Sequence, residues 1–445
     1  MKKILISNSL VVNEGIIHAK DILIKDKRIE KIGDHISEFN VDEIIDAEGL
    51  YLFPGMIDDQ VHFREPGLTH KANMDTESKA ALAGGVTSFI EMPNTVPQTI
   101  TINDFNNKRL IAKKSSAANY SFMFGITNNN YTEILKLDKN NVPALKMFLG
   151  SSTGQMLVDD YDLINKIFNN IDLVIAAHCE DEEIINKNLD NAIKKYGSKI
   201  PVFEHPNIRS EDACYVSSSN IVNLAKKAGA RLHVFHISTE KELSLFDNNT
   251  PLKKKKITAE ACIHHLWFSD KDYDRKGSFI KWNPSIKKIS DRDSILEGIN
   301  IDLIDVIASD HAPHTITEKN NSYLNCPSGG PLVQHSLLAL IDLFFEKKLS
   351  LEKIVEKVCH NPAILFQVKD RGFIREGYFA DLVLIDLKEK HLVQKNNILY
   401  KCGWSPFEGI SFKSSIKMTM LNGQWVYLNG EIVNTNAAME LKFDR

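Results

Sequence analysis

The chain has 445 residues, of which 43% are hydrophobic and 25% are charged, a composition typical of a globular protein. Its 54 basic and 58 acidic residues give a net charge of −4, so electrostatics offer no basis for binding nucleic acid or an anionic membrane surface. No apolar run approaches the roughly 20 residues of a membrane-spanning helix. The six cysteines form no C-x-x-C pair, which favours a reduced, cytoplasmic protein over a disulfide scaffold or a structural zinc site of cysteines.

Both ends of the chain are rich in short β-type runs broken by turn residues. The first four runs are Ile4–Ser7, Ile22–Ile24, Arg28–Ile32 and Glu43–Asp46. The last three are Ala380–Asp386, Ile416–Leu421 and Gln424–Leu428, with Asn-Gly pairs typical of hairpin turns at 422–423 and 429–430. We therefore expect one small β-sandwich domain assembled from residues 1–52 and 366–445.

Residues 53–365 alternate β-rich runs with helical patterns, which is typical of parallel βαβ units. The expected strands are Phe53–His62, Thr87–Met92, Tyr120–Ile126, Ala144–Leu149, Leu173–His178, Arg231–His236, Ile257–Ala261 and Val306–Asp310. The expected helices include Thr76–Ala83, Tyr161–Asn169, Ser217–Lys227 and Leu332–Glu346. Eight strands predict a TIM-type (β/α)8 barrel, an α/β fold in which function resides at the carboxyl ends of the strands.

Polar side chains gather at five of these strands. They are His62, Lys146, His178, His236 and Asp310. Each has an ordinary explanation by itself, because a strand-end histidine is often a core residue, a lysine can snorkel, and an aspartate can cap a helix. Their coincidence at one end of a barrel instead favours a catalytic site for zinc or a similar divalent ion, since imidazole and carboxylate suit such ions.

Nine motifs then match one family in order along the chain. They are PGMIDDQVHFREPG, GGVTSFIEMPNT, LKMFLG, VIAAHCED, HVFHIST, ITAEACIHHL, WNPSIK, IASDHAPH and NPAILF…RGFIREGYFADLVLIDL. Together they resemble the dihydroorotase family of the amidohydrolase superfamily, from about Ile4 to Gly430. HFREPG and SDHAPH are the most specific of them.

The resemblance implies a role for each polar strand-end residue. His62 matches the second histidine of the family's H-x-H metal motif, and His178 and His236 match the ligands of a second metal. Asp310 matches a metal-bound aspartate that also moves the proton as general base and then acid. Lys146 sits where many relatives carry a carboxylated lysine that bridges two metals, although some bacterial relatives use aspartate there. One or two zinc ions per chain are therefore expected.

The resemblance also implies how a substrate is held. Arg64, Asn94 and His314 match residues that grip a free carboxylate, and Asn283 matches an asparagine that contacts the pyrimidine ring. These residues favour reversible hydrolysis of dihydroorotate to N-carbamoyl-aspartate, in pyrimidine biosynthesis, over turnover of uncharged hydantoins or allantoin. An ion pair of Arg64 with Glu65 or Glu91 is the structural alternative to this role.

The family's H-x-H motif is Gln60-x-His62 in this chain, and glutamine offers only a neutral and weaker oxygen donor. Three outcomes follow for the metal position built with His62 and Asp310. The enzyme works with one tightly held ion, Gln60 substitutes as a ligand, or the chain is a catalytically silent partner of another pyrimidine enzyme. Retention of Arg64 and Asp310 favours an active enzyme, which we expect to be a homodimer by the same resemblance.

Several other polar residues near the motifs receive structural assignments. His205 and Arg209 are expected to be structural or to support the ligands, and one residue of the His264–His265 pair to face the site. Glu260 is treated in the same way, and His233 is expected to pack in the core because its side chain alternates away from that of His236. Residues 315–330 form a loop that we expect to close over the substrate.

Overall fold

The computed structural model describes residues 2–37, 40–150 and 156–445. Its first feature is a closed ring of eight parallel strand positions within these residues, the third of them interrupted at Met123. The ring strands are β6 (Met56–Val61), β7 (Val86–Glu91), β8 (Asn119–Phe122), β9 (Phe124–Gly125), β10 (Ala144–Phe148), β11 (Val174–His178), β12 (Leu232–Val234), β13 (Ile257–Cys262) and β14 (Val306–Ala308). A parallel bridge between Val61 and His311 joins the first strand to the last, so the expected barrel is confirmed.

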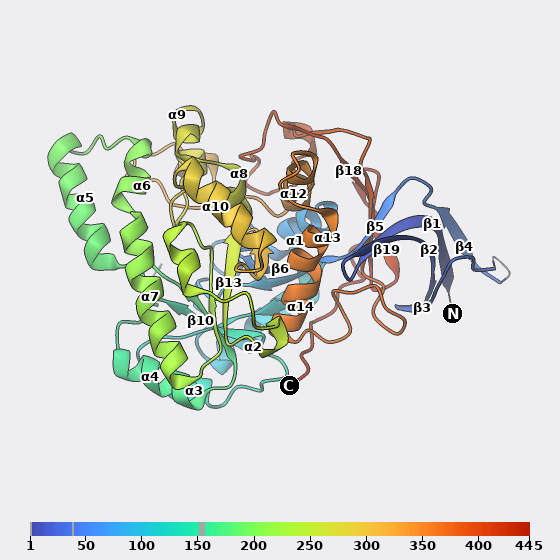
Figure 1. Cartoon of the computed structure of the whole chain (residues 1–445), viewed down its shortest axis with the longest axis horizontal. Coiled ribbons are helices and arrows are strands. Elements are labelled where there is room, and N and C mark those ends of the chain that lie inside the picture. Colours follow the sequence, from blue (N-terminus) through green and yellow to red (C-terminus); the bar gives the residue numbers. More distant parts are fainter. Residues whose placement is uncertain (1, 38–39, 151–155) are drawn as a thin grey trace.

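Helices connect and surround these strands (Figure 1). They are α1 (Met74–Ala83), α2 (Ile102–Ser115), α3 (Tyr131–Ile134), α4 (Tyr161–Asn170), α5 (Glu182–Tyr196), α6 (His205–Ile208), α7 (Glu211–Ala228), α8 (Ile263–Trp267), α9 (Tyr273–Lys276), α10 (Ile289–Asn300), α11 (Ile316–Lys319), α12 (Ser336–Phe345), α13 (Leu351–Val355) and α14 (Asn361–Phe366). Local sequence sets their ends: α7 is capped at its N-terminus by Ser210, whose side chain accepts from Ala213 N, and at its C-terminus by Gly229 in the left-handed conformation. Within the described ranges, no helix is both long and apolar enough to cross a membrane.

Strands from both ends of the chain form one mixed sheet of nine strands in the described part of the protein. They are β1 (Lys3–Asn13), β2 (Ile16–Lys25), β3 (Arg28–Gly33), β4 (Glu43–Asp46), β5 (Tyr51–Pro54), β15 (Leu382–Asp386), β18 (Ser415–Leu421), β19 (Gln424–Leu428) and β20 (Glu431–Ile432). Figure 1 shows the blue N-terminal strands beside the red C-terminal ones at one side of the barrel. A small hairpin of β16 (His391–Leu392) and β17 (Ser411–Phe412) stands apart from this sheet.

The expected strand Phe53–His62 is in fact two strands, which is a correction to the sequence prediction. β5 pairs with β1 and β15 in the terminal sheet, whereas β6 begins the barrel. Gly55 separates them, and a Cβ atom there would lie 2.1 Å from Thr87 Oγ1. Glycine is therefore required where the chain passes from one sheet to the other.

Candidate active site

One cavity of about 210 Å³ lies at the carboxyl ends of the barrel strands. It is lined by Gln60, His62, Arg64, Asn94, Lys146, Phe148, His178, His236, Trp282, Asn283, Asp310, Ala312, His314 and the segment 327–329. All ten site residues predicted from the sequence are in this lining. Side chains that are up to 254 residues apart along the chain therefore meet around one small space.

The backbone is strained at three of these residues. Arg64, His236 and Asp310 have positive φ angles of 68°, 40° and 46°, a conformation that side-chain-bearing residues rarely adopt. Such strain concentrates at functional sites, where the surrounding structure holds it in place. Here each strained residue directly follows a barrel strand or lies within three residues of its end.

His178 and His236 form the clearest pair of side chains in the cavity that could bind a metal. Nδ1 of His178 lies 2.9 Å from Nε2 of His236, so the two ring nitrogens face each other at hydrogen-bond distance. His178 Nε2 lies 2.9 Å from Glu180 Oε2. When Nε2 donates its proton to this carboxylate, Nδ1 keeps a lone pair that faces His236. Burial, followed by the charges of His178 and Lys146, keeps the pKa of His236 well below its usual value. The neutral imidazole that can bind a metal is therefore the form of His236 present at neutral pH.

Lys146 is a buried lysine whose Nζ atom has no hydrogen-bond partner among the described residues. Its ammonium group faces the Phe235 ring at 3.8 Å and the Phe148 ring at 4.8 Å. Burial lowers its pKa to about 7, so much of the amine is neutral near physiological pH. A neutral, unpartnered amine beside two metal-ligand histidines fits the formation of a carbamate that would bind metal.

Asp310 is contacted by two side chains from the end of β6. His62 Nε2 lies 3.3 Å from Asp310 Oδ1, and Gln60 Nε2 donates to the same oxygen at 3.3 Å. Asn94 Oδ1 lies 2.9 Å from His62 Nδ1 and fixes the ring by accepting its proton. Gln60 Oε1 accepts from Cys262 Sγ at 3.5 Å. Gln60 thus presents its amide nitrogen to Asp310, and Asn94 positions His62, a contact that the sequence motif did not indicate.

Arg64 and His314 line one corner of the cavity, and Lys71 lies behind His314, where it also pairs with Glu318 at 3.0 Å. Arg64 Nε donates to Pro313 O at 3.1 Å, and its Nη2 lies 3.1 Å from His314 Nε2. His314 Nδ1 accepts from Lys71 Nζ at 3.0 Å, and Nε2 lies 3.0 Å from Ser328 O, to which a neutral ring donates. In that form Nε2 does not accept from Arg64, whose Nη2 then packs against the ring without a hydrogen bond to it. Burial lowers the pKa of Arg64 to about 10, which still leaves it charged at neutral pH. Lys71 lies outside every motif, so the sequence did not point to it.

The alternative role of Arg64, an ion pair with Glu65 or Glu91, is not found in the described part of the chain. Glu91 Oε2 instead pairs with Lys108 Nζ at 2.9 Å, and Glu65 Oε2 accepts from Met74 N at 2.9 Å. The Arg64 guanidinium therefore keeps hydrogen-bond donors for an anion in the cavity that it lines.

An aromatic wall and a loop complete the cavity. Trp282 stacks on His264 with ring centroids 4.6 Å apart, so His264 is the member of the pair behind the site, while His265 Nε2 lies 3.2 Å from Pro284 O. Asn283 Oδ1, a buried atom, has no hydrogen-bond partner among the described residues.

The loop is anchored by two buried lysines. Lys319 Nζ donates to Pro327 O at 3.0 Å and Gly329 O at 2.8 Å, and Lys281 Nζ donates to Tyr323 O and Cys326 O. The loop of residues 315–330 therefore supplies part of the cavity wall through residues 327–329. Its closure over a substrate stays a prediction.

Two further sequence expectations concern residues behind the ligands. Arg209 Nη1 pairs with Glu180 at 2.5 Å, and His205 bonds Tyr323 Oη and Trp282 O at 2.8 and 2.6 Å. Both contacts agree with supporting roles. His233 differs, because its imidazole lies among carboxylates and not in an apolar core. The prediction that the side chain of His233 points away from the cavity was correct. The prediction of an apolar environment was wrong, because Asp59 and Glu260 lie beside it in the barrel interior.

Fold and cavity together define a β/α barrel whose strand-end cavity carries side chains of the kinds that bind metals. The amidohydrolase family model matches residues 51–426, and the chain belongs to this family. A dihydroorotase from Methanosphaera stadtmanae is 30% identical over 97% of this chain and 98% of its own length. An allantoinase from Desulfitobacterium hafniense is 29% identical over 99% of this chain and 98% of its own length. The solved structure of L-hydantoinase (dihydropyrimidinase) from Arthrobacter aurescens is 27% identical, with a TM-score of 0.93 over 99% of this chain and 100% of that one.

Proposed function

We propose that this chain is an enzyme that reversibly hydrolyses the cyclic amide of dihydroorotate to N-carbamoyl-aspartate, a step of pyrimidine biosynthesis. The observation that carries the proposal is the position of Arg64 and His314 in the wall of the cavity that also holds His178, His236 and Asp310. A charged arginine beside such a set suits a ring that carries a free carboxylate. The full-length similarity to proteins named dihydroorotase supports the same substrate.

The donor set fits a divalent ion, and we assign zinc as its identity. His178 and His236 would hold one ion together with Lys146 as a carbamate, and His62 and Asp310 would hold a second. When bound, such ions supply an activated water as nucleophile and polarise the amide carbonyl. Gln60 donates to Asp310, so in this orientation its contribution is to restrain that carboxylate. We therefore propose that the second position is the weaker one.

The residues of the chain then divide the remaining work. Arg64 and His314 bind the substrate carboxylate and fix the ring, and Lys71 orients His314 by donating to its Nδ1. Asn283 offers its unpartnered Oδ1 to a ring N–H, and Asn94 keeps His62 in one orientation. A cavity of about 210 Å³ is below the range of about 300–1,000 Å³ for drug-sized ligands, which suits a single small ring.

Asp310 is the proposed proton carrier. Its carboxylate accepts a proton from the attacking water and returns it to the ring nitrogen as the C–N bond breaks. Ring closure uses the same atoms in the opposite order. Contacts from His62 and Gln60 to one oxygen, Oδ1, leave Oδ2 in a defined position for this transfer.

A second candidate is hydrolysis of an uncharged ring of the hydantoin or allantoin kind. It is favoured by the similarity to an allantoinase and to the L-hydantoinase structure. The third candidate, a silent partner of another enzyme, rests on the glutamine at position 60. Arg64 separates the first two candidates because an uncharged ring gives its guanidinium nothing to neutralise.

One sample decides among these candidates. The purified protein is analysed for metal and then assayed, with zinc and bicarbonate, on dihydroorotate, hydantoin and allantoin. Ring opening of dihydroorotate by a zinc-containing protein is the expected result. Turnover of only the uncharged rings would establish the second candidate, and a metal-free, inactive protein would establish the third.

The remaining assignments concern the whole molecule. We propose a catalytic barrel of residues 53–365 and a β domain of residues 1–52 and 366–445 whose strands pack as a sandwich. One apolar cluster joins side chains from both ends, including Ile24, Leu52 and Leu384, which supports this packing. A homodimer and a cytoplasmic location stay predictions, to be tested by light scattering and cell fractionation.

A further inference from the structure

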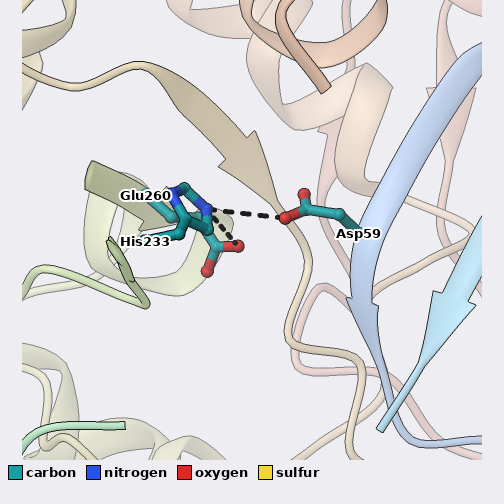
Figure 2. A group of neighbouring side chains, drawn as sticks. All are labelled: Asp59, His233 and Glu260. Carbon is teal, nitrogen blue, oxygen red and sulfur yellow. Dashed lines mark ion pairs between the residues drawn. The ribbon is translucent and has the colours of Figure 1, made fainter. Parts of the chain in front are cut away.

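Three ionisable side chains meet inside the barrel, outside the lining of the cavity. Asp59 extends from β6, His233 from β12 and Glu260 from β13, and each side chain is fully buried. Figure 2 shows Asp59 facing the other two across the barrel interior. None of them has a role in the reaction described above.

The distances within this cluster are those of ion pairs and are compatible with three ligands around one ion. His233 Nε2 lies 3.6 Å from Asp59 Oδ2 and 3.7 Å from Glu260 Oε2, which is too long for hydrogen bonds. Zinc binds nitrogen and oxygen at about 2.0–2.2 Å with tetrahedral geometry, which places two ligands about 3.3–3.6 Å apart. The observed distances are at or just above this spacing, and the three ligand atoms lie within 4.8 Å of one another, so one cation could reach all three.

The imidazole of His233 is oriented as a ligand. Its Nδ1 lies 2.8 Å from Thr258 Oγ1, and the Thr258 hydroxyl donates to Leu232 O at 3.3 Å. Thr258 must then accept the Nδ1 proton, so the second nitrogen, Nε2, points at the two carboxylates. Burial lowers the pKa of His233, but the contacts with Asp59 and Glu260 outweigh it and raise the pKa to about 9, so Nε2 holds either a proton or a bound cation. A ligand histidine is commonly fixed by a second hydrogen bond such as the one to Thr258.

The carboxylates have oxygen atoms directed to the same point. Glu260 Oε1 accepts from His236 N at 3.2 Å and from Cys262 Sγ at 3.3 Å, which leaves Oε2 for the cluster. Neither oxygen of Asp59 has a hydrogen-bond partner among the described residues. Buried carboxylates without partners are costly unless they are neutralised or bind a metal.

We propose that Asp59, His233 and Glu260 form a structural site for a zinc-like divalent ion, separate from the catalytic cavity. One nitrogen and two carboxylate oxygens suit such an ion, and full burial is typical of a structural site. The ion ties β6 to β12 and β13 across the barrel. Because Glu260 also accepts the backbone N–H of His236, the ion stabilises the strand end that carries this catalytic-site ligand.

The test counts ions on the intact chain without any substrate, so it is independent of the proposed reaction. Chelator-stripped protein is reloaded with zinc, dialysed and analysed for metal per chain in the wild type and in Asp59→Asn, which keeps the side-chain shape. We expect Asp59→Asn to bind one ion fewer than the wild type. The matched control is Asp58→Asn, a buried neighbour whose Oδ1 accepts from Ser309 N and which should keep the full count.

A second measurement on the unmodified protein covers the case in which the variant fails to fold. A crystal of the zinc-loaded wild type should give an anomalous peak between Asp59, His233 and Glu260. A peak in the cavity without one in this cluster would overturn the proposal and would mean that a protonated His233 forms ion pairs with the carboxylates in place of an ion. Equal metal content in Asp59→Asn and the wild type would overturn it as well.

Discussion

Replacing Arg64 with alanine tests the substrate assignment most directly. The guanidinium is buried, is held by Pro313 O and lies against His314, so few other groups can take its place in the cavity. Loss of two charge-assisted hydrogen bonds to a carboxylate removes at least about 3 kcal/mol of binding. At 1.36 kcal/mol per tenfold, kcat/KM for dihydroorotate should fall by about 160-fold or more.

The pattern of the loss matters more than its size. Because Arg64 contacts the carboxylate in both the ground state and the transition state, most of the loss should be in KM, with metal content unchanged. An uncharged ring such as hydantoin should lose little or nothing. The exposed Arg275, which pairs with Asp272 on the surface, provides the control variant Arg275→Ala.

Two results would refute the assignment of Arg64. One is unchanged kinetics on dihydroorotate, and the other is an equal loss on charged and uncharged rings, which would mean that the substitution disturbs the whole site. Thermal unfolding of the variant separates the second case from simple destabilisation.

Three further predictions concern the metal site and the loop. Burial lowers the pKa of Lys146 to about 7, and only the neutral amine adds CO₂. At constant dissolved CO₂, the rate at which metal-stripped enzyme is reactivated should therefore rise about tenfold per pH unit up to about pH 7 and then level off. A rate that does not change with pH would argue against a carbamate. Gln60→His should raise the zinc content by up to one ion per chain, measured by elemental analysis, and an unchanged content would contradict our account of that position. Lys319→Met removes the donor to Pro327 O and Gly329 O, so it should lower the free energy of unfolding by about 1–3 kcal/mol and raise KM. Denaturant unfolding and steady-state kinetics measure these two effects. Wild-type values of both would show that the lysine does not hold the loop.

The sequence alone predicted the barrel and most of its active site. Parallel strands place their carboxyl ends at one rim, so polar residues at those ends, such as His178 and Asp310, had to converge whatever the details of packing. The five strand-end residues line one cavity, together with the five residues that only the family resemblance had indicated. The hairpin turn at residues 422–423 could also be predicted from the local sequence. Asn422 and Gly423 have the positive φ angles that an Asn-Gly turn requires.

Only the tertiary structure decided what contacts what inside that frame. The amide of Gln60 points to Asp310, Lys71 supports His314, and His233 faces two carboxylates, and none of these contacts follows from spacing along the chain. Strand alternation tells which residues point into a barrel, but the partner of an inward side chain is set by strands on the opposite wall. Sequence thus determined the kinds of chemical group present, while closure of the barrel determined their pairing.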